Sequence, residues 1–179
     1  LMSRIHAAPL TASQRADGYR AHVAEIEERL AWAVGHISER GLLPAHLIEQ
    51  LPGWLPTPTE LAGTADDMVF IHGDLKLKHI YIEPDGERLR VSGAIDLGEA
   101  RVGQPLADIY YVWSSLIDGS AAVRDSFLAA LGIDVADRRD FARQALSWTI
   151  QQPQVLPRYD SSSAPERDLD ALADRIFGR

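Results

Sequence analysis

Residues 70–80 read Phe-Ile-His-Gly-Asp-Leu-Lys-Leu-Lys-His-Ile, and this segment is the most informative about the architecture of the chain. The apolar run at 68–71 predicts a short strand that leads into it. Asp74 then lies in a loop directly after that strand, which is an exposed but rigid place for a carboxylate. His79 follows five residues later, where the next predicted strand begins. The loop therefore carries two side chains that are able to move protons or hold a metal ion.

A β-hairpin is predicted after this loop. Its strands are expected at 79–82 and 88–95, and the Pro-Asp-Gly turn at 84–86 joins them. Asp96 comes directly after the second strand. Because a hairpin brings the ends of its strands together, we expect His79 and Asp96 to be adjacent, with Asp74 beside them.

Phosphoryl transfer would suit this group of side chains. The reaction needs an acceptor for the alcohol proton and cations that offset the phosphate charge. One carboxylate could serve as the base while the other two groups hold a divalent ion. Carboxylate oxygens suit Mg²⁺, and a neutral imidazole is tolerable in a mixed site.

The segments around the loop have the helical period. The longest helix is expected at 12–40, begun by Thr11 or Ser13 as cap and ended by Gly41. The further expectations are the tail of a helix within 1–10, a short helix at 44–51, a loop at 52–58, and helices at 106–117, 121–131, 137–151 and 165–177. The predicted class is α+β, mainly helical, with a small β insertion in a single domain of 179 residues.

Composition excludes several classes of protein. The net charge of −8 argues against nucleic acid as a partner and is compatible with a cationic substrate. Without cysteine there can be no disulfide and no thiolate metal site. No apolar run approaches the roughly 20 residues of a membrane span, and no signal segment opens the chain, so we expect no membrane partner and a cytoplasmic location.

The order and spacing of the motifs resemble the aminoglycoside and macrolide phosphotransferase family, which has the protein-kinase-like fold. Its catalytic loop begins His-Gly-Asp, as residues 72–74 do here. Residues 103–108, Gly-Gln-Pro-Leu-Ala-Asp, are similar to its Gly-Asp-Pro-x-x-Asp stretch, and residues 5–9, Ile-His-Ala-Ala-Pro, to its Leu-His-x-x-Pro stretch. The resemblance is close over 70–109 and loose over the rest of the chain.

The resemblance implies a role for each motif residue. Asp74 would be the catalytic base, and Lys76 would be a catalytic cation that stabilises the transition state. His79 and Asp96 would bind Mg²⁺ and, through it, the phosphates of ATP or GTP. His72 and Asp108 would be structural. Residues 70–109 would then hold the catalytic and metal loops, and the helices of 110–179 would form the substrate side.

Three departures from the family pattern matter. His79 stands where Asn is more common, although macrolide kinases and some aminoglycoside kinases also carry His at this place. Gln104 replaces the Asp of the family pattern, and the sequence does not explain this change. The sequence also has no Gly-x-Gly-x-x-Gly and no lysine before Lys76, whereas kinases clamp the nucleotide with such groups. We therefore expect a C-terminal lobe without its nucleotide lobe, inactive alone, that could dimerise through the face left uncovered.

The predicted function is O-phosphorylation of a hydroxyl on a small molecule. An antibiotic is the substrate we favour, and choline, homoserine or a sugar amine are the next candidates. A non-catalytic pseudokinase or binding module is the main alternative. A metal-dependent hydrolase that uses His72 as a ligand is another. The remaining histidines, including His6 and His22, are expected to be surface or capped residues, and the acids at 166, 168, 170 and 174 a solvated helix face or a contact for cationic sugars.

Overall fold

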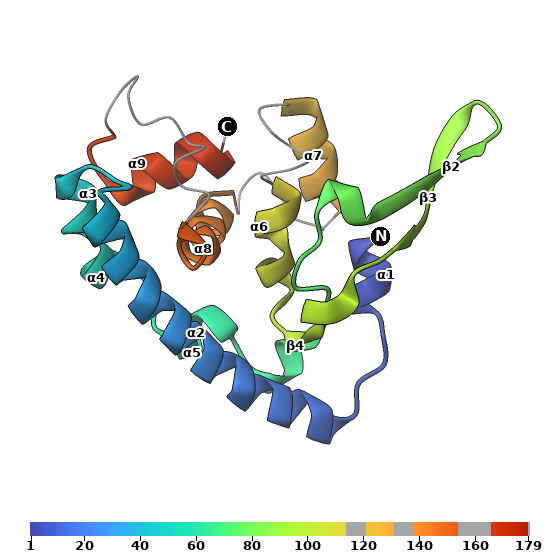
Figure 1. The fold of residues 1–179 in the computed structure, drawn as a ribbon, viewed down its shortest axis with the longest axis horizontal. Coiled ribbons are helices and arrows are strands. Elements are labelled where there is room, and N and C mark those ends of the chain that lie inside the picture. Colours follow the sequence, from blue (N-terminus) through green and yellow to red (C-terminus); the bar gives the residue numbers. More distant parts are fainter. Residues whose placement is uncertain (114–120, 131–137, 154–165, 179) are drawn as a thin grey trace.

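The computed structural model describes residues 1–113, 121–130, 138–153 and 166–178. Over these ranges the chain is mainly helical with two small antiparallel sheets, which confirms the α+β class. Helix α2 (Ala12–Arg40) runs along one edge of the molecule, and a narrow hairpin projects from the opposite side (Figure 1). Among the described helices, none combines the length and the apolar character that a membrane span requires.

Helix α2 has the bounds that the sequence predicts. Thr11 caps it, accepting from the backbone N–H of Gln14 while the Gln14 side chain accepts from the backbone of Thr11. Gly41 ends it in the left-handed conformation. One stripe of the helix is buried, at His22, Ile26, Leu30, Ala33 and Ile37. These positions recur every three or four residues, so the helix lays a single face on the core.

Three short helices follow where the sequence predicts one helix and a loop. They are α3 (Ala45–Ile48), α4 (Leu51–Trp54) and α5 (Pro58–Ala62). The predicted loop at 52–58 is thus wrong over most of its length. Pro52 and Pro58 lie in first helical turns, where the missing N–H costs nothing. Thr57 and Glu60 form a capping box that starts α5.

Two strand pairs carry the loops of interest. Strand β1 (Val69–Ile71) pairs with β4 (Arg101–Gly103), and β2 (Ile80–Asp85) pairs with β3 (Arg88–Ala94). The second pair is the predicted hairpin, turned at Gly86 with φ 63°. Strand β4 is not predicted, because three residues are too short to show alternation. By pairing with β1 it brings the end of the hairpin segment back beside the start of the His-Gly-Asp loop.

The C-terminal half is helical. A 3₁₀ turn (Pro105–Asp108) leads into α6 (Ile109–Val112), and the later helices are α7 (Ala121–Ala130), α8 (Arg138–Ile150) and α9 (Leu169–Ala173), which continues as a π-helical turn (Asp174–Gly178). The residues at 1–10 contribute α1 (Met2–His6). The parts of the predicted helices at 114–117, 131, 137 and 165 lie outside the described residues.

A single hydrophobic core joins these helices. Ile26 and Ile37 of α2, Ile109 of α6 and Leu146 of α8 are all essentially inaccessible to solvent. Trp113 packs on Phe177 with ring centroids 4.9 Å apart. Burial of an aliphatic side chain of this size contributes about 1.5–3 kcal/mol. The core therefore fixes α2, α6 and α8 relative to one another.

Candidate active site

The His72-Gly73-Asp74 loop turns sharply out of β1. Gly73 has φ 79°, a conformation that side chains disfavour. A Cβ atom on Gly73 would overlap the carbonyl oxygen of Glu99 and the guanidinium of Arg101. Glycine is thus required for the loop to lie against the segment that leads into β4.

Asp108 holds this loop from below. Its side chain is fully buried and accepts hydrogen bonds from the backbone N–H groups of His72 (3.0 Å) and Gly73 (2.7 Å). The ring Nε2 of His6 lies 3.2 Å from the same carboxylate. A buried carboxylate is tolerable only when hydrogen bonds and charges replace its water. Here α1 and two loop amides do so, which ties three distant segments together.

Both ring nitrogens of His72 are used by the backbone. Nε2 donates to the carbonyl oxygen of Ile95 (2.9 Å), and Nδ1 accepts from the N–H of Asp74 (3.3 Å). These two partners define one neutral tautomer. His72 therefore connects the His-Gly-Asp loop to the residue before Asp96. Neither nitrogen is available to a metal, which removes the observation that the hydrolase alternative needs.

His79 lies in the 3₁₀ turn Leu77–His79, just before β2, with its ring buried. Its Nδ1–H donates to the carbonyl oxygen of Asp74 (2.8 Å), and its ring stacks on that of His72 with centroids 6.0 Å apart. Its Nε2 is directed at Oδ2 of Asp96, 3.2 Å away. The backbone contact thus decides which nitrogen faces the site.

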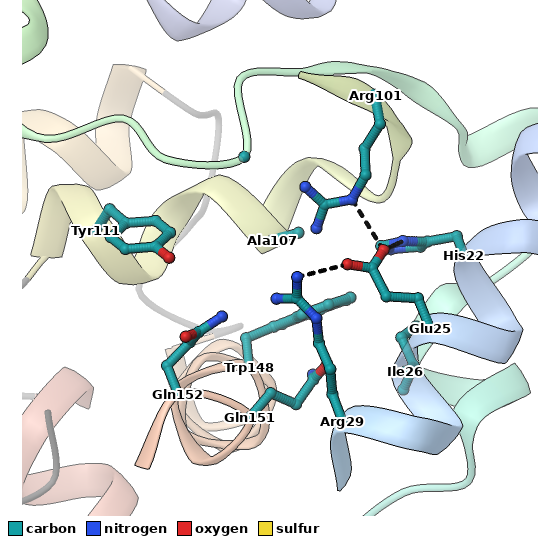
Figure 2. A pocket seen from close by; sticks show the side chains of 11 residues that line it. His22, Glu25, Ile26, Arg29, Arg101, Ala107, Tyr111, Trp148, Gln151 and Gln152 are labelled. Carbon is teal, nitrogen blue, oxygen red and sulfur yellow. Dashed lines mark hydrogen bonds and ion pairs between the residues drawn. The ribbon is translucent and has the colours of Figure 1, made fainter. Parts of the chain in front are cut away.

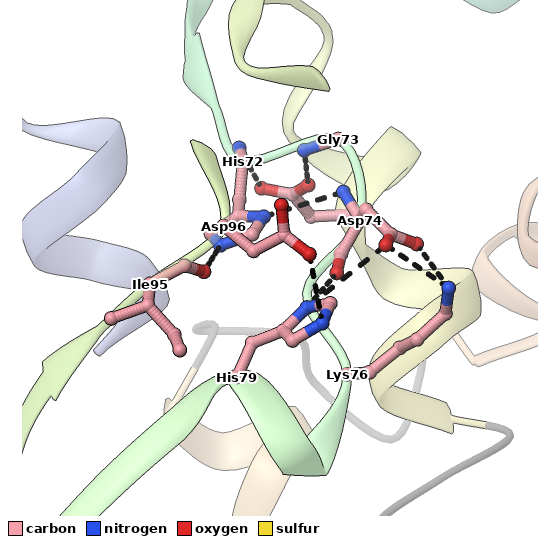
Figure 3. A network of polar contacts seen from close by, with 8 residues as sticks. His72, Gly73, Asp74, Lys76, His79, Ile95 and Asp96 are labelled. Atoms are coloured by element: carbon pink, nitrogen blue, oxygen red, sulfur yellow. Dashed lines mark hydrogen bonds and ion pairs between the residues drawn. The ribbon is translucent and has the colours of Figure 1, made fainter. Parts of the chain in front are cut away.

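Asp96 is the one non-glycine residue among those described with a positive φ, 66°. Aspartate tolerates this left-handed conformation better than most residues. The carboxylate is 59% exposed, and the neighbouring N–H of Ile95 donates to the carbonyl oxygen of His79 (3.0 Å). The hairpin therefore closes where the sequence predicts, with Asp96 presented to solvent above His79 (Figure 3).

Asp74, His79 and Asp96 converge. One candidate ligand atom from each lies within 4.8 Å of the other two. Nδ1–H of His79 donates to the Asp74 carbonyl, so Nε2 is the ring nitrogen that faces a carboxylate oxygen of Asp96 at 3.2 Å. A metal ion between Nε2 and the carboxylates, or a proton on Nε2, makes this contact favourable. The donor set therefore fits a divalent ion.

Lys76 pairs with Asp74 within the loop. Its Nζ lies 2.7 Å from Oδ1 and 3.0 Å from Oδ2, and 4.9 Å above the centre of the Tyr111 ring. Burial raises the pKa of the Tyr111 phenol, and the charge of Asp74 raises it further. The structure thus places a cation at the carboxylate predicted to be the base, next to a neutral phenol.

Three residues near the site were not recognised from the sequence. His6 was expected at the surface, although its Ile-His-x-x-Pro context was the available signal. Gln104 caps the 3₁₀ turn that presents Asp108, since its side chain accepts from the N–H of Leu106. His22 is buried, stacks on Trp148 with centroids 5.4 Å apart, and accepts from the N–H of Gln104 (3.2 Å). The contacts of His6 with Asp108 and of His22 with Gln104 join residues far apart in the chain, whereas the Gln104 cap is a local contact with Leu106.

The sequence profile of the phosphotransferase enzyme family (APH) matches residues 1–148. This match covers most of the chain and all of the loops described above. The chain belongs to the phosphotransferase enzyme family. Among curated protein sequences, none matches it. The narrower resemblance to aminoglycoside and macrolide kinases stays a prediction.

Proposed function

We propose that this chain is the catalytic-loop lobe of a protein-kinase-like enzyme that transfers a phosphoryl group from ATP or GTP to a hydroxyl of a small molecule. The observation that carries the proposal is the convergence of Asp74, His79 and Asp96 within 4.8 Å of one another in a member of a phosphotransferase family. The segment 70–109 would hold the catalytic and metal loops, and the helices beyond it would form the substrate side.

Asp74 is the group that orients the acceptor hydroxyl and takes its proton. Its carboxylate is partly buried and held by Lys76 at 2.7 Å, so it has a fixed position. As transfer proceeds, Lys76 can lend its positive charge to the transferred phosphoryl oxygens, since it is close enough to Asp74 to serve both. The Asp74 backbone is held in turn by His79 and His72.

His79, through Nε2, and Asp96, through its carboxylate, are the residues that would hold Mg²⁺. The ion, when bound, would offset the negative charge of the nucleotide phosphates. Asp108 and His72 contribute by keeping the two loops in register, through the amides of the His-Gly-Asp loop and the Ile95 carbonyl. Because a glycine-rich loop and a strand lysine do not occur in these 179 residues, we expect them to be inactive in isolation.

The test is an exchange of single carboxylates in the complete protein. Asp74→Asn should lower kcat by about a hundredfold or more, as loss of a general base does. Asp96→Asn should raise the Mg²⁺ concentration needed for half-maximal rate. Asp85→Asn, at the exposed far end of the hairpin, is the matched control and should leave both quantities unchanged. Unaltered turnover in Asp74→Asn would remove the assignment of the base.

The pseudokinase alternative predicts no product formation, whether or not nucleotide binds. Titration of Mg²⁺–nucleotide by calorimetry, with product formation followed in parallel, separates the two functions. Binding with turnover supports the enzyme, whereas binding without turnover, or no binding, supports the module. The antibiotic acceptor stays a prediction.

A further inference from the structure

A small pocket lies behind the catalytic loop, between α2, β4, α6 and α8 (Figure 2). Its volume is about 20 Å³, enough for a water-sized group but not for a sugar ring. Gly73, the residue before Asp74, is part of its wall. The polar ends of Arg29, Arg101, Tyr111 and Gln152 are directed towards the same space in the close view.

The pocket has an excess of positive charge. Glu25 lies between the two arginines, with Oε1 2.7 Å from Arg29 and Oε2 2.8 Å from Nε of Arg101. Two guanidinium groups thus share one carboxylate. Nδ1 of His22 lies 3.4 Å from that carboxylate without a hydrogen bond, while its Nε2 accepts a backbone hydrogen bond, which requires the neutral ring. Among the described residues neither arginine forms an ion pair with a second carboxylate, although the exposed Glu99 is near enough for its charge to act on Tyr111 as theirs do.

The pocket is also close to the candidate catalytic carboxylate. Tyr111 forms one of its walls, and the ammonium of Lys76 lies 4.9 Å above that ring while contacting Asp74 at 2.7 Å. Lys76 already balances the charge of Asp74, so Asp74 does not neutralise the arginines. One aromatic ring therefore separates the cationic pocket from the place where an acceptor hydroxyl would react.

Three of the four acids that could have received a cationic substrate make contacts elsewhere. Asp170 accepts from the indole N–H of Trp54 (2.7 Å). Asp168 caps α9 by accepting from the N–H of Ala171 (2.8 Å). Glu166 pairs with Arg175. These three carboxylates hold the C-terminal helix in place, so they do not face the pocket that Arg29 and Arg101 line.

We infer that the acceptor carries an anionic group, a carboxylate or a phosphate, which Arg29 and Arg101 bind while its hydroxyl lies at Asp74. This inference rests on the proposed function. Guanidinium groups suit such ligands because their paired donors match the oxygens of either anion. Because the pocket holds only a water-sized group, the anion would lie at the pocket mouth against the two guanidinium groups, with the hydroxyl-bearing part further out. A polycationic aminoglycoside would be repelled here, so hydroxy acids or sugar phosphates are the favoured acceptors.

Binding of the anion can be tested without activity. Inorganic phosphate and acetate are titrated separately into the complete protein by calorimetry, at constant ionic strength and with EDTA present to keep the metal residues out of the measurement. Saturable binding is expected for at least one anion, weaker by about tenfold in Arg29→Gln and largely restored in Arg29→Lys. Arg20→Gln, which removes an exposed ion pair on the same helix, is the matched control and should bind like wild type.

Activity gives the second readout. A hydroxy acid and its neutral amide are compared as acceptors, and so are a sugar phosphate and the free sugar. The anionic member of at least one pair should have a KM lower by about tenfold, an advantage that Arg29→Gln abolishes with kcat and the KM for nucleotide unchanged. A change in nucleotide KM instead would assign the arginines to the nucleotide and overturn the inference.

The two proposals fail in different ways. In the first case Asp74→Asn abolishes transfer, but anionic and neutral acceptors have the same KM and Arg29→Gln changes neither. The proposed function is then supported, and the inference about the anion is wrong. If neither anion binds the wild-type protein, or if Arg29→Gln binds phosphate and acetate as strongly as wild type, the arginine pair only connects α2 to β4. If Asp74→Asn keeps full activity, the proposed function is wrong whatever the anions do. Melting temperatures of all variants identify any that are merely unfolded.

Discussion

Nδ1–H of His79 donates to the carbonyl oxygen of Asp74 over 2.8 Å, and this contact leaves Nε2 as the ring nitrogen that faces Asp96. When the ring is neutral, the lone pair of Nε2 is directed at the space that His79 shares with Asp96. This orientation supports the proposal that His79, which stands where asparagine is more common, is a metal ligand.

Replacing His79 should accordingly separate metal affinity from folding. In His79→Ala the Mg²⁺ concentration for half-maximal rate should rise by about tenfold or more, the size typical of damage to a metal site. His79→Asn should recover most of the loss, because an amide oxygen can take the position of Nε2. His36→Ala, which removes a ring stacked on Trp32 on α2, is the control. Equal Mg²⁺ dependence in all four proteins would mean that His79 is not a ligand.

Two glycines offer a contrast in backbone conformation. Gly73→Ala should lower the free energy of unfolding by about 2 kcal/mol or more and abolish activity, because φ is 79° and a Cβ would overlap the Glu99 carbonyl. Gly35→Ala, in the middle of α2 with open space around the new methyl, should raise stability by about 0.5–1 kcal/mol.

Urea denaturation at pH 7 measures both effects. The Gly35 variant shows that an added methyl is not itself harmful in this protein. Native stability in Gly73→Ala would contradict the geometry of the His-Gly-Asp loop described above.

Local signals explain what the sequence predicts well. The cap at Thr11 and the left-handed Gly41 define α2, since both act within a turn of the helix they end. The turn at Gly86 defines the hairpin, and the hairpin in turn places Asp96 beside His79. These features depend on neighbours in the chain, so a single sequence contains them.

Contacts between distant segments explain most of the features that the sequence did not predict. Strand β4 exists because it pairs with β1, about thirty residues earlier, and three residues carry no period of their own. His6 reaches Asp108 across 102 positions. Gln104 differs from these two, because it caps its own turn by accepting from the N–H of Leu106, a local contact that the sequence did not reveal. Tertiary packing decides the pairing of β4 and the contact between His6 and Asp108.

Asp108 should contribute more to stability than any surface carboxylate. Asp108→Ala removes the acceptor for two loop amides and leaves them buried, so the free energy of unfolding should fall by about 3 kcal/mol. His6→Ala removes one contact at a partly exposed ring and should cost about 1 kcal/mol.

The double variant tests whether the two residues act together. Because His6 acts on Asp108, the combined loss in urea denaturation should be smaller than the sum of the single losses. Strict additivity would mean that the 3.2 Å contact between them contributes nothing.

Glu25 joins α2 to β4, and we expect its contribution to stability to be lost in acid. Burial raises the pKa of its carboxyl, but the contact with His22 and the charges of Arg101 and Arg29 outweigh burial and lower the pKa from 4.5 to about 2. The folded state therefore favours the ionised form. Its stabilising contribution is complete above pH 4.5, and it is lost as the pH falls from 4.5 towards 2.

Comparison with Glu25→Gln isolates this contribution from that of the other acids. With allowance for solvent screening of a partly exposed group, the wild-type protein should be more stable than the variant by about 1–2 kcal/mol at pH 7. The difference should shrink steadily as urea denaturation is repeated at pH 4 and pH 3. A difference that stays constant across this range would show that the arginines do not bind Glu25 more strongly when it is charged, and it would leave both guanidinium groups without the anchor that positions them beside the catalytic loop.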